Sequence, residues 1–229
     1  MSIDFTSITG SADYILSGIR YTLELTAITA VGGLALGTAL ALCRLSRNKF
    51  LSNFSRFYTN LMRAVPLVLI LFWFFLLMPE VLKVILGLDH PVMIGADLTA
   101  IITFVLFEAA YFSEIMRAGI QSVSKGQLSA AKALGLRYGQ TMRYIVLPQA
   151  FKRIIPPLGN EFIAMLKDSS LVSVIGFEEL TRSGQLIIAE TYGTLEIWTC
   201  VAILYLVMTL TISQIVSRLE KRFKKSDER

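Results

Sequence analysis

Five long runs of apolar residues are separated by shorter polar segments along the chain. Each run approaches the roughly 20 residues that an α-helix needs to cross the hydrocarbon core of a bilayer. The pattern predicts membrane-spanning helices over residues 19–43, 64–88, 97–120, 154–175 and 195–216. Pro156, Pro157 and Gly159 interrupt the fourth run, so we expect a broken helix there. Because no internal repeat or water-soluble domain stands out, we expect a single transmembrane domain over residues 1–229.

The composition agrees with a membrane protein. Of the 229 residues, 54% are hydrophobic and 17% are charged, and the mean hydropathy is +0.61. A soluble domain carries about 25% charged residues, so a water-soluble globular protein and a disordered chain are both excluded. One histidine and two cysteines leave no basis for a metal cluster. The phosphate-binding pattern G-x-x-x-x-G-K-[ST] is absent, so we expect no ATP binding, no cofactor and no enzymatic activity in this chain.

Basic residues are concentrated in three polar segments. Residues 43–63, 115–155 and 217–229 contain 18 of the 22 lysines and arginines, and the first two segments contain no acidic residue. The positive-inside rule places all three segments in the cytoplasm. Five spans then put the N-terminus in the periplasm and the C-terminus in the cytoplasm. The pI near 9.3 therefore reflects membrane topology, and we expect no binding to nucleic acid.

The segment 121–153 is the longest polar stretch between the predicted spans. Its alanine-rich residues 127–134 indicate a short helix, and Gly135 suits the left-handed conformation that ends such a helix. A second short helix over about residues 138–146 should end before Pro148. Two short helices joined at a glycine form a compact knob that a neighbouring surface could approach closely. The pattern alone leaves a second interpretation open, a loop lying along lipid headgroups.

The sequence of this knob resembles the EAA loop of bacterial ABC importer permeases. The matching positions are Ala130, Ala131, Gly135, Ile145, Leu147 and Pro148. Ser129 stands where the family has a glutamate, which removes a charged contact but leaves the shape of the knob. The segments 63–67, 108–123 and 166–172 resemble polar amino-acid permeases, and residues 74–88 and 107–123 look closest to glutamate/aspartate importer permeases.

The resemblance implies an all-α integral membrane protein of the bacterial plasma (inner) membrane with the fold of a type I ABC importer permease. Permeases of this family pair as homodimers or heterodimers and receive substrate from a periplasmic or lipid-anchored amino-acid-binding protein. Two ATPase subunits bind from the cytoplasm and carry the ATP and magnesium. Residues 121–153 would then form the coupling element that sits in a groove of the ATPase.

Three acidic residues fall well inside predicted spans, where an ionisable group costs about 2.5–3.5 kcal/mol at the bilayer centre. They are Glu108, Glu161 and Asp168. Such groups tend to face a cavity or a partner, and broken helices build the substrate sites of many transporters. Glu161 and Asp168 are two helical turns apart and share one face if the helix continues.

A site for an amino acid needs donors for its carboxylate and an acidic acceptor for its ammonium group. We predict that Arg63 binds the carboxylate and that Asp168 accepts hydrogen bonds from the ammonium group. Ser169 and Ser170 would add neutral donors, with Glu108 and Glu161 as further acids of the site. Structural roles stay open for three of these residues: Arg63 as an interfacial anchor, Asp168 within an ion pair, and Glu108 in helix packing.

Two other patterns predict packing contacts. Small residues recur at every fourth position of the first span, which is typical of a close helix–helix contact. These residues are Thr29, Gly33, Gly37 and Ala41. Glu114 and Arg117 are three residues apart near the inner end of the third span, so we expect a local ion pair between them.

Three classes of protein compete for this pattern. An ion-coupled secondary amino-acid transporter would use Glu108 and Asp168 as proton or sodium sites, but such transporters usually contain inverted repeats. A membrane-embedded enzyme needs a nucleophile with a base, or a metal cluster, and neither stands out. The resemblance therefore favours the permease subunit of an ATP-driven importer for polar L-amino acids, with glutamate or aspartate as the favoured cargo.

Overall fold

Helices form every regular element of residues 10–224, the part of the chain that the computed structural model describes, as the predicted all-α class requires. The α-helices are α2 (Ala12–Leu45), α3 (Lys49–Ala64), α4 (Leu67–Phe72), α5 (Met78–Leu86), α6 (Ala96–Gln121), α7 (Lys125–Ala133), α8 (Tyr138–Thr141), α9 (Leu147–Asp168), α10 (Leu180–Thr191) and α11 (Thr194–Lys224). Two π-helical turns (Trp73–Leu77 and Met142–Val146) and a 3-10 helix (Ser169–Ile175) lie between them.

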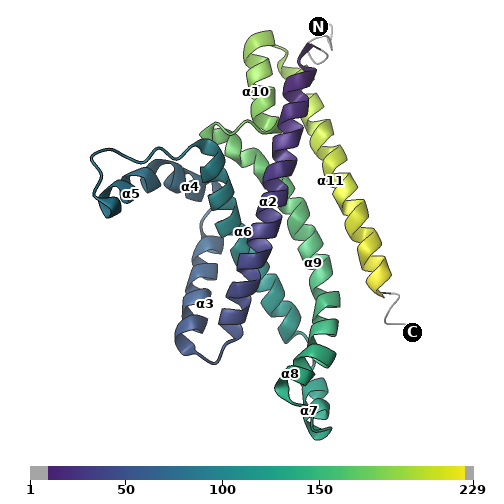
Figure 1. Cartoon of the computed structure of the whole chain (residues 1–229). Coiled ribbons are helices and arrows are strands. Elements are labelled where there is room, and N and C mark those ends of the chain that lie inside the picture. The colour runs from purple at the N-terminus through teal and green to yellow at the C-terminus, as the bar shows by residue number, and fades with distance from the viewer. Residues whose placement is uncertain (1–9, 225–229) are drawn as a thin grey trace.

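Within residues 10–224, the most extensive helix packing is that of α2 against α6 (Figure 1). A Cβ atom added to Gly37 would lie 2.7 Å from the Phe112 Cβ and 2.8 Å from the Ala109 carbonyl oxygen. A Cβ at Gly33 would lie 3.0 Å from the Phe112 ring. The two backbones therefore approach so closely that glycine, which has no Cβ atom, is needed at these positions. The predicted role of the small-residue stripe in helix packing is confirmed.

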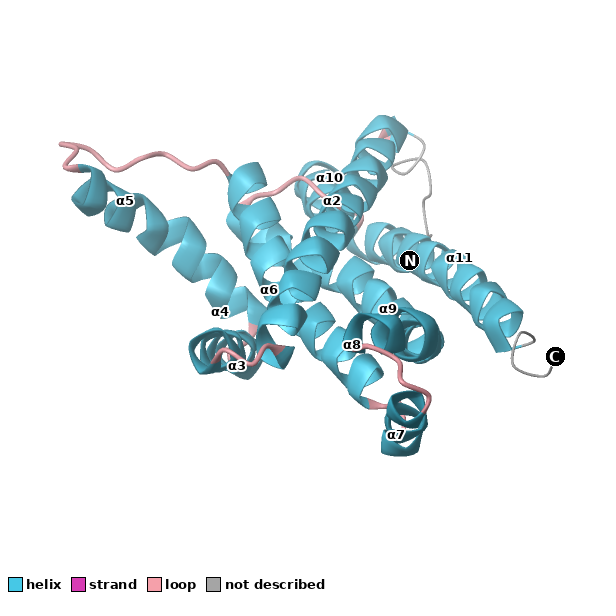
Figure 2. Ribbon diagram, turned by 60° about the horizontal axis from the view of Figure 1, so that its bottom comes forward, coloured by secondary structure: helices cyan, strands magenta, loops and turns pink. Residues whose placement is uncertain are grey.

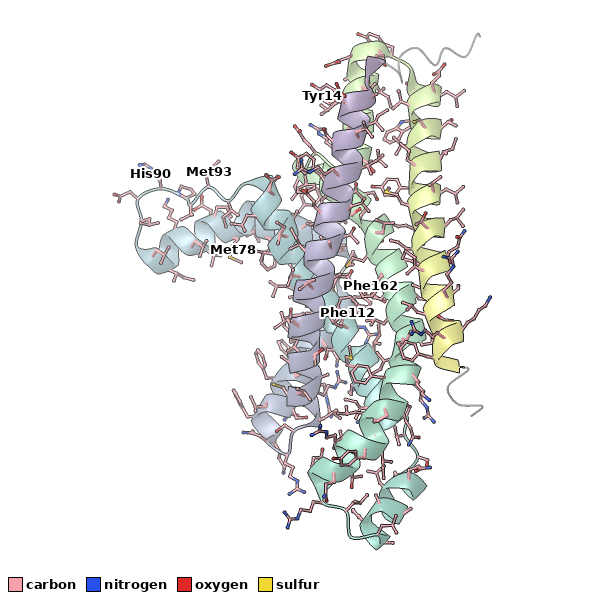
Figure 3. All side chains as sticks on the ribbon, turned by 45° about the vertical axis from the view of Figure 1, so that its right-hand side comes forward. Tyr14, Met78, His90, Met93, Phe112 and Phe162 are labelled. Carbon is pink, nitrogen blue, oxygen red and sulfur yellow. The ribbon has the colours of Figure 1, made fainter. Side chains whose placement is uncertain are left out.

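Helix α9 also packs against α6. The rings of Phe112 and Phe162 meet between the two helices with centroids 5.7 Å apart at an interplanar angle of 63° (Figure 3). Phe104 and Met165 are fully buried in the same cluster. Aromatic pairs in this edge-on arrangement contribute beyond the area that they bury, so Phe112 links α6 to both α2 and α9.

Both π-helical turns lie directly before a proline. In Met142–Val146, the N–H of Leu147 donates to the carbonyl five residues earlier, immediately ahead of Pro148. The turn Trp73–Leu77 stands before Pro79 in the same way. Proline has no N–H and its ring clashes with the carbonyl four residues earlier, and the wider turn relieves both problems. The predicted end of a short helix before Pro148 is therefore wrong, because α8 continues through the π turn into α9.

The predicted break at the two central prolines of the fourth span is also wrong. Helix α9 continues through Pro156 and Pro157. Both residues fix φ near −65°, which is a helical value, and Gly159 lets a valine of α11 pack directly on the helix backbone. The α-helix ends instead at Asp168, where the 3-10 helix begins and leads to Gly176 at φ 88°. The irregular backbone thus lies toward the C-terminal end of the predicted span.

Helix α3 follows α2 at a sharp corner and was not predicted from hydropathy. Asn48 caps its N-terminus by accepting hydrogen bonds from the N–H groups of Phe50 and Leu51. Its only buried residues are Ser55 and Thr59, and the Ser55 hydroxyl donates to a carbonyl of α2 at 2.7 Å. Polar side chains therefore dock this helix on its neighbours, which explains the weak hydrophobic signal.

Four of the described helical segments are long and apolar enough to cross a membrane. They are Ala12–Leu45, Leu67–Leu86, Ala96–Gln121 and Thr194–Phe223. Helix α9 has 22 residues, but charged side chains along it lower its hydropathy. The predicted span over residues 154–175, the count of five spans and the periplasmic N-terminus therefore remain predictions.

Helix α5 and the loop that follows it project away from the other helices as an arm (Figure 2), whereas α4 is packed against the core. Met78, His90 and Met93 mark this arm in Figure 3, and no residue of α5 is buried. The corner between α2 and α3 and the α7–α8 segment lie toward one end of the molecule, away from α10 (Figure 1). The basic segments 43–63 and 115–155 therefore share an end of the fold.

Candidate functional site

A cavity of about 550 Å³ collects four of the six residues predicted for a substrate site. Arg63 reaches it from the last turn of α3, Glu108 from the middle of α6, and Glu161 and Asp168 from α9. The remaining lining is largely apolar and comes from the same three helices, from the link into α4 and its first residue, and from the 3-10 helix. These residues are Ala64, Val65, Pro66, Leu67, Phe107, Tyr111, Ala164 and Leu171. The volume is within the range of small-molecule sites.

Glu108 is the most buried of the charged residues around this cavity. Its exposed fraction is 2%, and its Oε2 atom has no hydrogen-bond partner among the described residues. Glu161, on α9, lines the same cavity. The Glu108 side chain therefore packs between helices, as the structural interpretation expects, and also lines the cavity, as the functional interpretation expects.

Arg63 is held over an aromatic ring. Its guanidinium carbon lies 5.3 Å from the centroid of Tyr111, which is within the range of a cation–π contact. The helix that carries Arg63 ends at Ala64 because Pro66 disfavours helical geometry in the preceding residue. Arg63 is exposed, and it faces two cavities. Tyr111 was not predicted as a site residue, since a tyrosine in an apolar helix carries no signal of its own.

The two predicted serines do not line the cavity. The Ser169 hydroxyl is buried and donates to the Leu166 carbonyl at 2.6 Å, and the Ser170 hydroxyl donates to the Lys167 carbonyl at 2.8 Å. Both serines thus satisfy carbonyl groups where α9 gives way to the 3-10 helix. Asp168, at the last position of α9, does line the cavity.

A second cavity, of about 440 Å³, shares Arg63, Tyr111 and Glu161 with the first. It extends along α6 to Glu114 and along α9 to Arg153. The two cavities therefore meet at the Arg63–Tyr111 pair and together follow the groove between α6 and α9.

The predicted ion pair between Glu114 and Arg117 is confirmed, with an N–O distance of 2.6 Å. A second arginine, Arg44 at the end of α2, lies 3.1 Å from the same carboxylate and also donates to the hydroxyl of Thr59 in α3. This small network joins α2, α3 and α6 beside the second cavity. Arg44 was missed because 70 residues of sequence separate it from Glu114.

The predicted coupling knob is present as α7, a turn and α8. Gly135 has φ 75°, and the N–H of Leu136 donates to the Ala131 carbonyl at 3.0 Å, which is the pattern of a left-handed helix end. Ala131 is buried, whereas Ala130 and Gly135 are exposed. Ile145 lies half-buried in the π turn, and Leu147 and Pro148 begin α9 at the surface.

A small apolar cluster fixes the knob to the rest of the fold. Val123, Val146, Ala150 and Ile154 are its buried members. On the opposite side the large side chains of Leu134 and Tyr138 are 79% and 77% exposed. The knob therefore presents apolar side chains outward from a firmly packed base.

Glu179 is a buried acidic residue that sequence reasoning missed. Its exposed fraction is 0%, and it caps α10 by accepting hydrogen bonds from the N–H groups of Thr181 and Arg182. The hydroxyl of Tyr205 in α11 donates to the same carboxylate at 2.6 Å. Burial raises the pKa of Glu179, and these three donors act in the opposite direction. A glutamate followed closely by an apolar helical stretch was the available signal for this cap.

Among the described residues no group of three or more His, Cys, Asp or Glu side chains could hold a metal ion.

A charged cavity along a helical membrane bundle, with an exposed helical knob beside it, is the architecture of a membrane transport component. A family model described as the binding-protein-dependent transport system inner membrane component matches residues 33–225, and the chain belongs to this family. It is therefore an inner-membrane permease subunit.

Known relatives cover nearly the whole chain. The glutamate/aspartate import permease GltK of Escherichia coli O157:H7 is 41% identical, over 96% of this chain and 97% of its own length. The arginine transport system permease ArtQ of Bacillus subtilis is 36% identical over 99% of this chain and 100% of its own. The glutamine transport system permease GlnP of Escherichia coli is 34% identical over 98% and 99%.

Solved structures agree with the fold. A chain of an amino acid ABC transporter, crystallised with histidines, is 37% identical and superposes with a TM-score of 0.88 over 97% of this chain and 100% of that chain. A chain of the MetNI methionine ABC transporter in an inward-facing conformation shares the fold at 20% identity, with a TM-score of 0.73 over 91% and 95%.

Proposed function

We propose that this chain is the permease subunit of an ATP-driven importer of polar L-amino acids, and that the cavity between α3, α6 and α9 is a point on its translocation path. The observation that carries the proposal is the convergence of Arg63 with Glu108, Glu161 and Asp168 on one cavity. A guanidinium fork and carboxylates are the groups that recognise the two ends of an amino acid.

The partners follow from the family. The chain would act as one transmembrane domain over residues 1–229, with five spans and a periplasmic N-terminus, beside a second permease that is either identical or a paralogue. A periplasmic or lipid-anchored binding protein would deliver the amino acid. An ATPase dimer would carry ATP and magnesium and receive the coupling knob, and the exposed apolar side chains on the knob support this contact. An ion-coupled secondary transporter is not favoured, because the relatives are permeases of transport systems.

The nature of the cargo is a finer question. The sequence resemblance favours glutamate or aspartate, and GltK carries those names. The arginine and glutamine permeases ArtQ and GlnP are nearly as similar and match an equal share of the chain. Identity alone therefore does not separate acidic, neutral and basic amino acids, and the lining of the cavity has to be considered.

The test of the proposed site is amino-acid uptake by the complete importer in proteoliposomes, with the binding protein supplied at saturation. We expect Arg63→Gln and Asp168→Asn each to lower uptake by about 10- to 100-fold, because each removes one charge-assisted contact. ATPase assembly, checked by co-purification, should be unchanged.

Matched controls come from exposed charges that lie outside the cavity. Arg56→Gln lies on the same helix as Arg63, and Glu178→Gln removes an exposed carboxylate beyond the 3-10 helix. Both should transport like the wild type. Full uptake by Arg63→Gln and Asp168→Asn would place amino-acid recognition in the binding protein alone.

A further inference from the structure

The cavity between α3, α6 and α9 carries an unequal number of charges. Three carboxyl groups line it, those of Glu108, Glu161 and Asp168, against a single basic residue, Arg63. The ion pairs found among residues 10–224 lie elsewhere, so no base in the described chain neutralises these carboxyl groups at salt-bridge distance. Lys167, next to Asp168, is exposed and does not line the cavity. The cavity is therefore suited to a ligand that brings positive charge.

Glu108 locates the position at which that charge would be bound. Its side chain is 98% buried in helix packing, yet its Oε2 atom has no hydrogen-bond partner among the described residues. A buried polar atom without a partner is costly, so native proteins rarely retain one without a reason. Because Glu108 lines the cavity, an ammonium or guanidinium group in the cavity would lie beside its carboxyl group.

The three carboxyl groups outnumber the one basic residue of the lining. Even with one proton bound among the three carboxyl groups, two negative charges stand against the single positive charge of Arg63, so at least one negative charge remains uncompensated. An amino-acid backbone carries one carboxylate and one ammonium group and therefore changes nothing in this balance.

We propose that this cavity selects an L-amino acid with a cationic side chain, whose ammonium or guanidinium group is bound by Glu108 and Glu161. The backbone carboxylate would lie on Arg63 and the backbone ammonium group on Asp168, which rests on the proposed function. A lysine- or arginine-like cargo offsets this excess of negative charge. Glutamate or aspartate would add a further negative charge to the cavity, in a region of low dielectric where like charges repel strongly. The charge of the site thus favours a basic cargo over the acidic one that the resemblance suggests.

The experiment is equilibrium binding to the purified complex of the permeases and the ATPase in nanodiscs, without the binding protein. Radiolabelled L-lysine, L-arginine, L-glutamine and L-glutamate serve as probes. We expect L-lysine or L-arginine to bind at least tenfold more tightly than L-glutamine, and L-glutamate to bind most weakly. Glu161→Gln and, independently, Glu108→Gln should weaken binding of the basic probe by about 10- to 100-fold and leave L-glutamine within about threefold. Glu190→Gln, an exposed carboxylate on α10, should leave every probe unchanged.

The outcomes separate this inference from the function on which it rests. Tightest binding of L-glutamate, or an equal loss of L-lysine and L-glutamine in both variants, overturns the basic cargo and leaves an amino-acid site in place. Absence of binding by every probe to the wild-type complex overturns both, since the permease then has no amino-acid site of its own. Retained ATPase co-purification in each variant excludes misfolding as the cause of lost binding.

Discussion

The contact between α2 and α6 depends on the absence of a side chain at Gly37. At Gly37 a single added carbon would lie 2.7 Å from the Phe112 Cβ and 2.8 Å from the Ala109 carbonyl oxygen. Neither atom is the end of a flexible side chain, so both helices would have to separate. The same two helices carry Glu108 and the Glu114–Arg44 ion pair, and separation would disturb both.

We therefore predict that Gly37→Ala destabilises the protein by about 1–3 kcal/mol, the usual cost of overpacking. For a chain of this length the midpoint of thermal unfolding should fall by roughly 2–4 °C per kcal/mol. The measurement is the unfolding midpoint of the purified complex in detergent. Gly139→Ala is the control, since an added Cβ there meets nothing within 4 Å. Equal midpoints for the two variants would show that α2 and α6 do not pack this closely.

Residues that act within one helix could be predicted from the sequence, and residues that meet across helices could not. The stripe of Gly33 and Gly37 has a period, and the Glu114–Arg117 pair has a spacing, so both patterns are visible in the chain. Arg44 reaches Glu114, and Tyr205 reaches Glu179, only through the packing of separate helices. No local pattern encodes such a meeting.

At the scale of elements, the knob formed by α7 and α8 depends on one backbone conformation. Gly135 at φ 75° ends α7 and redirects the chain into α8, while an added Cβ would touch nothing within 4 Å. Position 135 therefore requires a residue that adopts positive φ, and it places no limit on side-chain volume. Gly135 is exposed at the surface that we propose as the ATPase contact.

We predict that Gly135→Val lowers ATPase co-purification and amino-acid-stimulated ATP hydrolysis by at least tenfold, because a β-branched residue is strongly disfavoured at positive φ. Gly135→Asn should retain most of both activities, since asparagine tolerates this conformation. Membrane insertion, measured by the yield of purified permease, should be equal in both. Normal coupling in Gly135→Val would exclude the knob as the coupling element.

Helix boundaries were harder to predict than helices. The presence of α7 and its end beside Gly135 were predicted, although the helix begins two residues before the predicted start, at Lys125. The prolines led to wrong predictions in two places. A proline was expected to end a helix, whereas a π turn before Pro148 and the helical φ of Pro156 and Pro157 keep the helix continuous. Helix α3 was not predicted because polar residues hold it against its neighbours.

At the scale of the whole molecule, the distribution of charge and the fold indicate the same orientation of the chain in the membrane. The basic segments 43–63 and 115–155 lie far apart in the sequence and share one end of the structure (Figure 1). Helix α10 and the N-terminal end of α2 lie at the opposite end. Helix α11 runs from the α10 end of the fold back toward the α7–α8 end. It can do so only because α9, despite its charged side chains, first carries the chain in the opposite direction. Both observations favour five spans.

We predict from this arrangement that Asp89 and Thr191 are outside the cell membrane and Lys125 is inside. Single cysteines at these positions, in a variant lacking Cys43 and Cys200, should be tested with a thiol reagent that does not cross membranes. All three residues are exposed, so accessibility in the fold does not limit the reaction. Asp89→Cys and Thr191→Cys should be labelled in intact spheroplasts, and Lys125→Cys only after the membrane is permeabilised. Labelling of Lys125→Cys in sealed spheroplasts would reverse the topology, and protection of Thr191→Cys alone would remove α9 from the spans and leave four.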